Sequence, residues 1–285
     1  MQGRYWIGAC LMACAFVALA GSGAATARKQ VEASMVLTGS ITVAPDGRVS
    51  AHTLDKPNKL EKGIVAMVND TIPSWRFEPV LQQGKAVAST ARMSLQVVAK
   101  KIDADHFSIR IRNANFSVPA ADATSSANWM AGKSMTPPRY PPVAYRSGVT
   151  GTVYLVARLG TDGHVLDVAA EQVNLGFVGS ESEMAYFRDA LAKPALQVAR
   201  SWRLTPATEE EAAAGKIRSV RIPVAYRLDA MPSYGHWESY VPGPKQPVSW
   251  LAGEVDALSS PDALVAGNVY EVGKGLHLLT PLGES

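Results

Sequence analysis

A hexapeptide occurs twice in this chain, as S-W-R-F-E-P at residues 74–79 and as S-W-R-L-T-P at residues 201–206. The segments upstream also correspond, since residues 39–49 and 151–165 both run from Gly through alternating β-branched residues to Asp-Gly-x-Val. Such alternation around Asp-Gly is typical of two strands joined by a tight turn. A Gly-Lys pair then opens a further apolar run after each copy. The unit is far longer than a solenoid repeat, so the sequence predicts two copies of one small α+β domain.

A helix is predicted directly before each tryptophan. Apolar residues recur at helical spacing there, and they are Leu60, Ile64, Met67 and Val68 in the first copy and Leu191, Ala195, Val198 and Trp202 in the second. Pro73 is expected to end the first helix, and Pro194 to kink the second or to start its last segment. After each helix, two apolar residues lie two positions apart in an extended segment and so share one side. Trp75, Phe77, Trp202 and Leu204 are therefore predicted core residues, with the intervening arginine pointing outward.

The rest of the chain divides around these two copies. The first, residues 36–117, carries one more alternating run, F-S-I-R-I-R, which predicts an extra strand. Small polar residues at 118–136 indicate a linker, and the second copy occupies residues 137–229. Residues 230–285 are rich in Pro and Gly but also contain several Trp and Tyr residues. We expect this segment to be an irregular arm packed on the domains or, alternatively, an exposed partner-binding segment.

The first 27 residues have the pattern of an export signal. Arg4 precedes an uncharged apolar run, and a small-residue triplet ends at Ala27. Cleavage is the preferred interpretation, while an uncleaved anchor formed by residues 5–27 and a lipoprotein signal at Cys14 are alternatives. Both cysteines, Cys10 and Cys14, lie in this segment. A mature chain without cysteine excludes a disulfide framework, a thiolate metal site and a Cys nucleophile.

No pattern in the sequence predicts catalysis, a cofactor or a bound metal. The five histidines are scattered without metal-ligand spacing, and no G-x-S-x-G motif occurs. A phosphate-loop-like stretch at residues 127–134 is followed by two prolines, which disfavour the helix that such a loop requires. The net charge of +3 is too small to argue for nucleic acid. We therefore expect a protein that is not an enzyme.

The second copy resembles the C-terminal domain of TonB-family energy transducers. The resemblance covers residues 137–229, beginning at P-P-R-Y-P-P-V-A-Y-R-S-G-V-T-G-T-V. The matching positions are Pro138, Tyr140, Pro141, Ala144, Gly148, Gly151, Val153, Asp162, Gly163, Trp202 and Pro206, with residues 220–228 as the closing strand. The resemblance implies a β-β-α-β domain in the periplasm of a Gram-negative bacterium. It also implies a protein or peptide partner, such as an outer-membrane receptor segment, added as a strand to the sheet edge.

The predicted function is periplasmic protein or peptide binding associated with envelope transport. The residues expected at the interface are Tyr140, Pro141, Arg218, Val220, Arg221, Val224 and Arg227. The three arginines form either one polar, solvent-facing side of the last strand or a basic edge for an acidic peptide. Fewer than ten residues separate Ala27 from the first strand, a reach of roughly 30 Å. Energy transduction with an inner-membrane anchor is therefore the first alternative, and an unrecognised enzyme or inhibitor the second.

Overall fold

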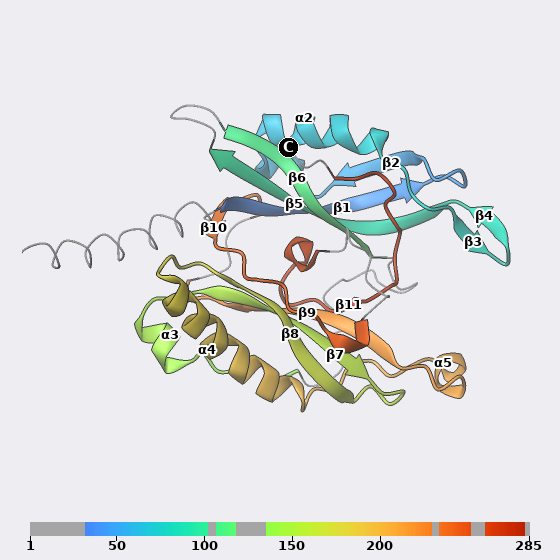
Figure 1. Cartoon of the computed structure of the whole chain (residues 1–285). Helices are drawn as coiled ribbons and strands as arrows, with labels where there is room; N and C mark the ends of the chain where they lie inside the picture. The colour runs from blue at the N-terminus through green and yellow to red at the C-terminus, as the bar shows by residue number, and fades with distance from the viewer. Residues whose placement is uncertain (1–31, 102–106, 118–134, 230–233, 252–259, 283–285) are drawn as a thin grey trace, which may run out of the picture.

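The computed structural model describes residues 32–101, 107–117, 135–229, 234–251 and 260–282. Two antiparallel sheets lie one above the other, with helix α2 on the outer side of the first and helix α4 on the outer side of the second (Figure 1). Segments from the C-terminal end of the chain run between the two sheets. The described residues after 233, namely 234–251 and 260–282, are called the C-terminal tail below.

The first sheet has the strand order β10-β1-β5-β6, and β2 also pairs with β1. Its strands are β1 (Glu32–Val43), β2 (Val49–Leu54), β5 (Ser89–Lys101), β6 (Phe107–Ser117) and β10 (Glu238–Tyr240). Its helices are η1 (Pro57–Lys59), α2 (Lys62–Thr71) and η2 (Ile72–Ser74). A separate two-stranded hairpin, β3 (Val80–Gln82) with β4 (Lys85–Val87), projects from this half (Figure 1). The alternating run after residue 106 thus forms the extra strand predicted from the sequence.

The second sheet has the strand order β11-β9-β7-β8. Its strands are β7 (Gly151–Leu159), β8 (Val165–Leu175), β9 (Arg218–Tyr226) and β11 (Tyr270–Glu271). The helices of this half and of the tail are α3 (Pro142–Arg146), α4 (Glu181–Ala199), α5 (Glu209–Ala213), η3 (Ser249–Leu251) and η4 (Pro261–Ala263). A capping box between Ser180 and Glu183 starts α4, and the helix continues through Pro194.

The two halves share both strand order and turn geometry. Setting the added strands aside, the order is β5-β1-β2 in one sheet and β9-β7-β8 in the other. Gly47 and Gly163 adopt φ of 80° and 81° in the two Asp-Gly turns. The N–H of Phe77 donates to the Gly47 carbonyl at 2.8 Å, and the N–H of Leu204 donates to the Gly163 carbonyl at 2.9 Å. Each repeated hexapeptide is therefore held against the turn of its own half in the same way.

Both tryptophans of the repeat lie in hydrophobic cores. Trp75 and Trp202 are each 2% exposed, and the apolar residues two positions later, Phe77 and Leu204, are also buried. The intervening arginines are exposed. On α4, Leu191 and Ala195 are buried as the spacing predicts, although Ala199 rather than Val198 completes the buried face. Removal of either indole would cost about 3–5 kcal/mol, because the cores are closely packed around it.

Candidate protein-binding edge

Strand β9 closes the second sheet beside β7, and its other side is the candidate edge. β7 pairs with β9 along its whole length, from Leu159 opposite Arg218 to Gly151 opposite Tyr226. Pro223 lies within this strand, although proline cannot donate a hydrogen bond to a ladder. Its carbonyl faces outward and accepts from the Gly267 N–H at 3.2 Å. The N–H that proline lacks would have pointed to the outer side, so no hydrogen bond between β7 and β9 is lost.

The C-terminal tail covers part of this outer side. Tyr270 and Glu271 of β11 pair with residues 221 and 220 of β9. Beyond the pair, the N–H of Val272 donates to the Ser219 carbonyl at 2.8 Å. Together with the Gly267 contact, these bonds span residues 219–223 of the strand. The edge expected to receive a partner is therefore occupied by a short segment of the same chain.

Side chains of the tail anchor this segment on both faces of the sheet. Val269 is 6% exposed and joins the core between the sheet and α4. Val272 packs on the opposite face beside Val248 and Leu251, which cover Val156 of β7. The second sheet is thus buried on both faces, with the tail supplying the apolar cover on the side away from α4.

An ion-pair cluster holds the end of β11. The ammonium of Lys274 lies 3.1 Å from Glu211 of α5 and 2.9 Å from Glu271. The hydrogen bond from Lys274, followed by one from the Thr208 backbone, lowers the pKa of Glu211 to about 2. Burial lowers the pKa of Lys274, but the hydrogen bonds to the two carboxylates outweigh burial and raise that pKa overall. The sequence presents Glu209–Glu211 only as a charge run, whereas the structure gives Glu211 a specific cation.

The corresponding edge of the first sheet is filled differently. β5 occupies the place that β9 has in the second sheet, and β6 pairs with it over ten residues of β5, from Arg92 opposite Ser117 to Lys101 opposite Phe107. β11 makes two such pairs with β9. The same position in the two sheets therefore holds a long strand in one case and a very short one in the other.

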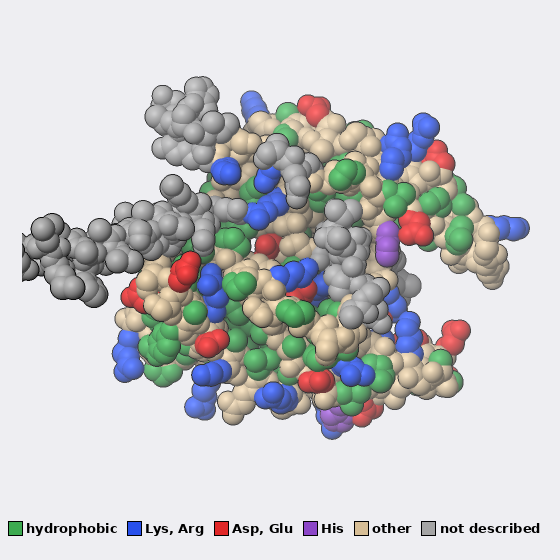
Figure 2. Space-filling model, in the orientation of Figure 1, with side chains coloured by type: hydrophobic (Ala, Val, Ile, Leu, Met, Phe, Trp, Pro, Cys, Tyr) green, Lys and Arg blue, Asp and Glu red, His purple; other side chains and the backbone are tan. Residues whose placement is uncertain are grey.

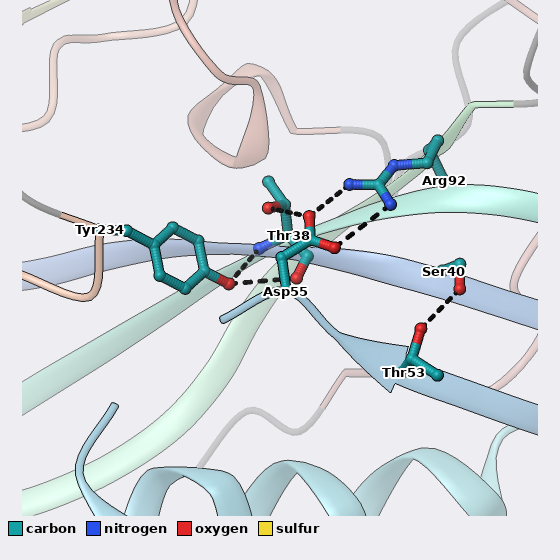
Figure 3. Close-up of polar contacts among 6 residues, drawn as sticks. All are labelled: Thr38, Ser40, Thr53, Asp55, Arg92 and Tyr234. Carbon is teal, nitrogen blue, oxygen red and sulfur yellow. Dashed lines mark hydrogen bonds and ion pairs between the residues drawn. The ribbon is translucent and has the colours of Figure 1, made fainter. Parts of the chain in front are cut away.

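The tail also contacts the other edges. β10 pairs with Glu32–Ser34 of β1, and the Tyr234 hydroxyl bonds the Thr38 N–H and C=O at 3.0 and 3.1 Å (Figure 3). On the second sheet, Val241 exchanges two backbone hydrogen bonds with Leu175 of β8. The tail therefore connects an edge of the first sheet to an edge of the second.

Beside Tyr234, a polar cluster joins β1, β2 and β5. Asp55 accepts hydrogen bonds from Thr38 at 2.6 Å and from the guanidinium of Arg92 (Figure 3). Burial alone would raise the pKa of Asp55, but the bonds from Arg92 and Thr38 lower it below its ordinary value. Nearby, the Ser40 and Thr53 hydroxyls bond across β1 and β2 at 2.7 Å.

The structure corrects the expectation for one of the three arginines, Arg221 of β9. Arg221 is 3% exposed, and its Nε and Nη2 atoms lie 2.7 and 3.1 Å from the two carboxylate oxygens of buried Glu171 on β8. Arg227 pairs with Glu238 at 2.6 Å, and Arg218 donates to the Thr205 carbonyl at 2.5 Å. Neither a solvent-facing side nor a free basic edge describes Arg221, because its side chain is buried and paired with Glu171.

The remaining expected interface residues support the edge from within. Val220 is buried and Val224 half-buried, and both side chains face the core under α4. The Tyr140 hydroxyl donates to the Val149 carbonyl at 2.7 Å, and its ring lies 5.4 Å from that of Tyr226. Pro141 precedes α3 and is half-exposed. A strand added to the outer side of β9 would therefore bond to backbone groups of its odd-numbered residues, and not to the side chains of Val220 or Val224.

Charges are mixed over the surface rather than gathered. In the view of Figure 2, basic and acidic side chains intersperse over both halves. Within the described ranges, no three His, Cys, Asp or Glu side chains form a group that could hold a metal. Among those same residues, no helix is long and apolar enough to cross a membrane. The expected signal segment and most of the expected linker lie outside the described residues.

Comparison with known proteins identifies a TonB-like region. Two proteins named Protein TonB, from two strains of Xanthomonas campestris pv. campestris, are each 35% identical to the chain over 98 residues. The chain contains a region similar to TonB. That region is 34% of this chain, and the chain spans only 37% of the length of these curated relatives. No family model matches the chain, and no solved structure matches it.

Proposed function

We propose that this chain is a periplasmic, non-enzymatic protein linked to outer-membrane transport, and that it binds a protein or peptide segment by strand addition to the outer side of β9. In this proposal the two halves are tandem TonB-like β-β-α-β domains, of which the second carries the binding edge. The similarity of a 98-residue region to proteins named Protein TonB supports the link to transport.

The observation that carries the proposal is the contrast between the two sheets. In the first sheet, the strand position equivalent to β9 has accepted a complete antiparallel strand over ten residues. In the second sheet, β11 pairs with two residues of the nine-residue strand β9, and hydrogen bonds to the Ser219 and Pro223 carbonyls flank these pairs. The full strand at the equivalent position of the first sheet supports strand addition at β9, which is an established mode of peptide recognition.

The chemistry of the edge fits a peptide rather than a small polar ligand. Carbonyls of Ser219 and Pro223 point outward along β9, spaced for main-chain donors of an antiparallel strand. Each such bond contributes about 1 kcal/mol, so affinity grows with the length of the paired segment. A partner that extends along Val224–Tyr226 as well would pair with more of the strand than β11 does.

Site-specific cross-linking tests the proposal. A photoreactive residue at Ala225, which is half-buried on β9 beyond the β11 pairs, should form an adduct with an envelope protein in intact cells of the bacterium that produces the chain. The matched control is Gln197, which is exposed on α4 at a distance from the edge in the fold. Mass spectrometry identifies the adduct. Equal adducts at both positions, or none at Ala225, would refute strand addition at β9.

Energy transduction for outer-membrane uptake is a second candidate, favoured by the name of the relatives. It requires residues 5–27 to remain in the inner membrane. Cell fractionation separates the two candidates, because a soluble periplasmic protein lacking these residues could not transmit force from that membrane.

A further inference from the structure

We infer that residues 267–274 are a built-in competitor for the β9 edge, and that the partner segment displacing them carries a lysine or arginine that pairs with Glu211. The inference rests on the proposed function, because it concerns the same edge. It adds the chemistry of the partner and a restraint on when the partner can bind.

The covering segment is short and hinged at both ends. Its direct hold on the backbone of β9 consists of the two β11 pairs and the flanking bonds to Ser219 and Pro223. Gly267 and Gly273 lie on either side, with φ of 84° and 74°, and a Cβ at either would meet nothing within 4 Å. Small residues in open space readily absorb the backbone rotation of a hinge. The segment can therefore leave while the β7–β9 ladder stays intact.

Departure of the segment removes the nearest cation from Glu211. The Glu211 carboxylate is 3.1 Å from Lys274 and 3.7 Å from Lys216, and its side chain is only 17% exposed. Its other oxygen accepts from the Thr208 N–H, which fixes the carboxylate at the start of α5. A cationic side chain in an incoming segment restores the lost pair at this fixed position.

The resident segment also shows which apolar position the edge accepts. Val269 enters the core under α4, where it belongs to the same buried cluster as Leu204 and Val220. An incoming strand must fill this place or leave a gap in the core. The structure therefore favours an extended segment with a β-branched or similar apolar residue at the place of Val269 and a cation at the place of Lys274.

A peptide that copies the segment provides the probe. Fluorescein-labelled A-G-N-V-Y-E-V-G-K-G-L, the sequence of residues 266–276, is titrated with the full chain, and anisotropy is measured. Val272→Pro deletes the donor to Ser219, and Val272→Ile is the matched control because it keeps the N–H, the β-branch and the apolar contact. The proline variant should bind at least about fivefold more tightly than the wild type, the factor given by one lost hydrogen bond of about 1 kcal/mol. The isoleucine variant should match the wild type.

The cation is tested with a second peptide in which the lysine is replaced by glutamine. On the proline variant, this peptide should bind about three- to fivefold more weakly than the lysine peptide, the range of a modest ion pair. The difference should vanish when Glu211→Gln is added. Lys274→Gln in the otherwise unchanged chain is an independent variant at an exposed side chain, and it should also strengthen binding of the lysine peptide.

Three results would overturn the inference. These are equal binding of the lysine peptide by the wild type and the proline variant, no binding by a folded Lys274→Gln chain, and equal binding of the two peptides by the proline variant. Cross-linking at Ala225 keeps the two proposals apart. If the Ala225 adduct forms but Val272→Pro does not increase its yield, strand addition is supported and the competitor is refuted. If the adduct forms in neither chain, strand addition itself is refuted.

Discussion

Substitution of Gly163 by alanine should destabilise the protein strongly. This glycine adopts φ of 81°, a region in which an L side chain is strained by about 1–2 kcal/mol. A Cβ here would also lie 2.2 Å from the Leu204 carbonyl oxygen, which is backbone and cannot rotate away. Relief of that contact must displace the repeated hexapeptide from the turn.

The displacement has its own cost. The Leu204 N–H donates to the Gly163 carbonyl at 2.9 Å, and loss of that bond adds about 1 kcal/mol. These two contributions sum to a loss of about 2–3 kcal/mol in the free energy of unfolding. Gly148 offers a matched control because it has φ of 66° but nothing within 4 Å of a built Cβ. Gly148→Ala should therefore cost only the conformational part, about 1–2 kcal/mol.

Urea unfolding of the two variants, followed by tryptophan fluorescence, measures the difference. Gly163→Ala should lie about 1 kcal/mol below Gly148→Ala, the contribution of the lost hydrogen bond, and Gly47→Ala should behave like Gly163→Ala, because its Cβ would meet the Phe77 carbonyl oxygen at 2.2 Å. Equal stabilities for Gly163→Ala and Gly148→Ala would contradict the close approach of hexapeptide and turn.

Three further predictions concern the ion pairs and the N-terminus. Arg221→Met should destabilise the chain by about 1.5–3 kcal/mol in urea unfolding, because buried Glu171 loses two charged hydrogen bonds and keeps only Lys245, at 3.4 Å, as its cation. Arg221→Met with Glu171→Leu should recover most of the loss, and a double variant as unstable as the single one would contradict this. Since the folded pKa of Glu211 is about 2 and its ordinary value 4.5, its pair with Lys274 stabilises the fold above pH 4.5 and is lost as the pH falls towards 2. The stability difference between wild type and Lys274→Gln should therefore shrink over that range, and a difference independent of pH would oppose the assignment. Cleavage of the export signal predicts a mature chain beginning at Arg28, and mass spectrometry of the purified protein checks it, with an intact N-terminus as the contrary result.

The local architecture could be predicted because its signals are short-range. Asp-Gly between alternating runs specifies a turn from neighbouring residues, and the spacing of Trp75 and Phe77 assigns both to one side of a segment without knowledge of the rest. The same reasoning placed a strand after residue 106. In each case the deciding interaction lies within one half of the chain.

The environment of β9 could not be predicted in the same way. Period-two alternation alone separates Arg218 from Arg221, so the sequence pattern places these two on opposite faces of the strand. What buries Arg221 is the tail and a carboxylate on β8, fifty residues away in sequence. The tail lacks strong periodicity, so neither the β11 pairing nor the Lys274 contact to Glu211 has a sequence signature.

The pairing of β10 with β1 has a consequence for biogenesis. Residues 32–34, the first that the structure describes, receive their hydrogen-bonding partners from residues 238–240. This edge of the first sheet cannot form completely until residues 238–240 have been synthesised, and pairing between residues so distant in sequence slows folding. Until then, the unpaired backbone groups of β1 are exposed, as in edge strands from which aggregation starts. We therefore expect chains cut short before residue 238 to be proteolysed faster than the full chain.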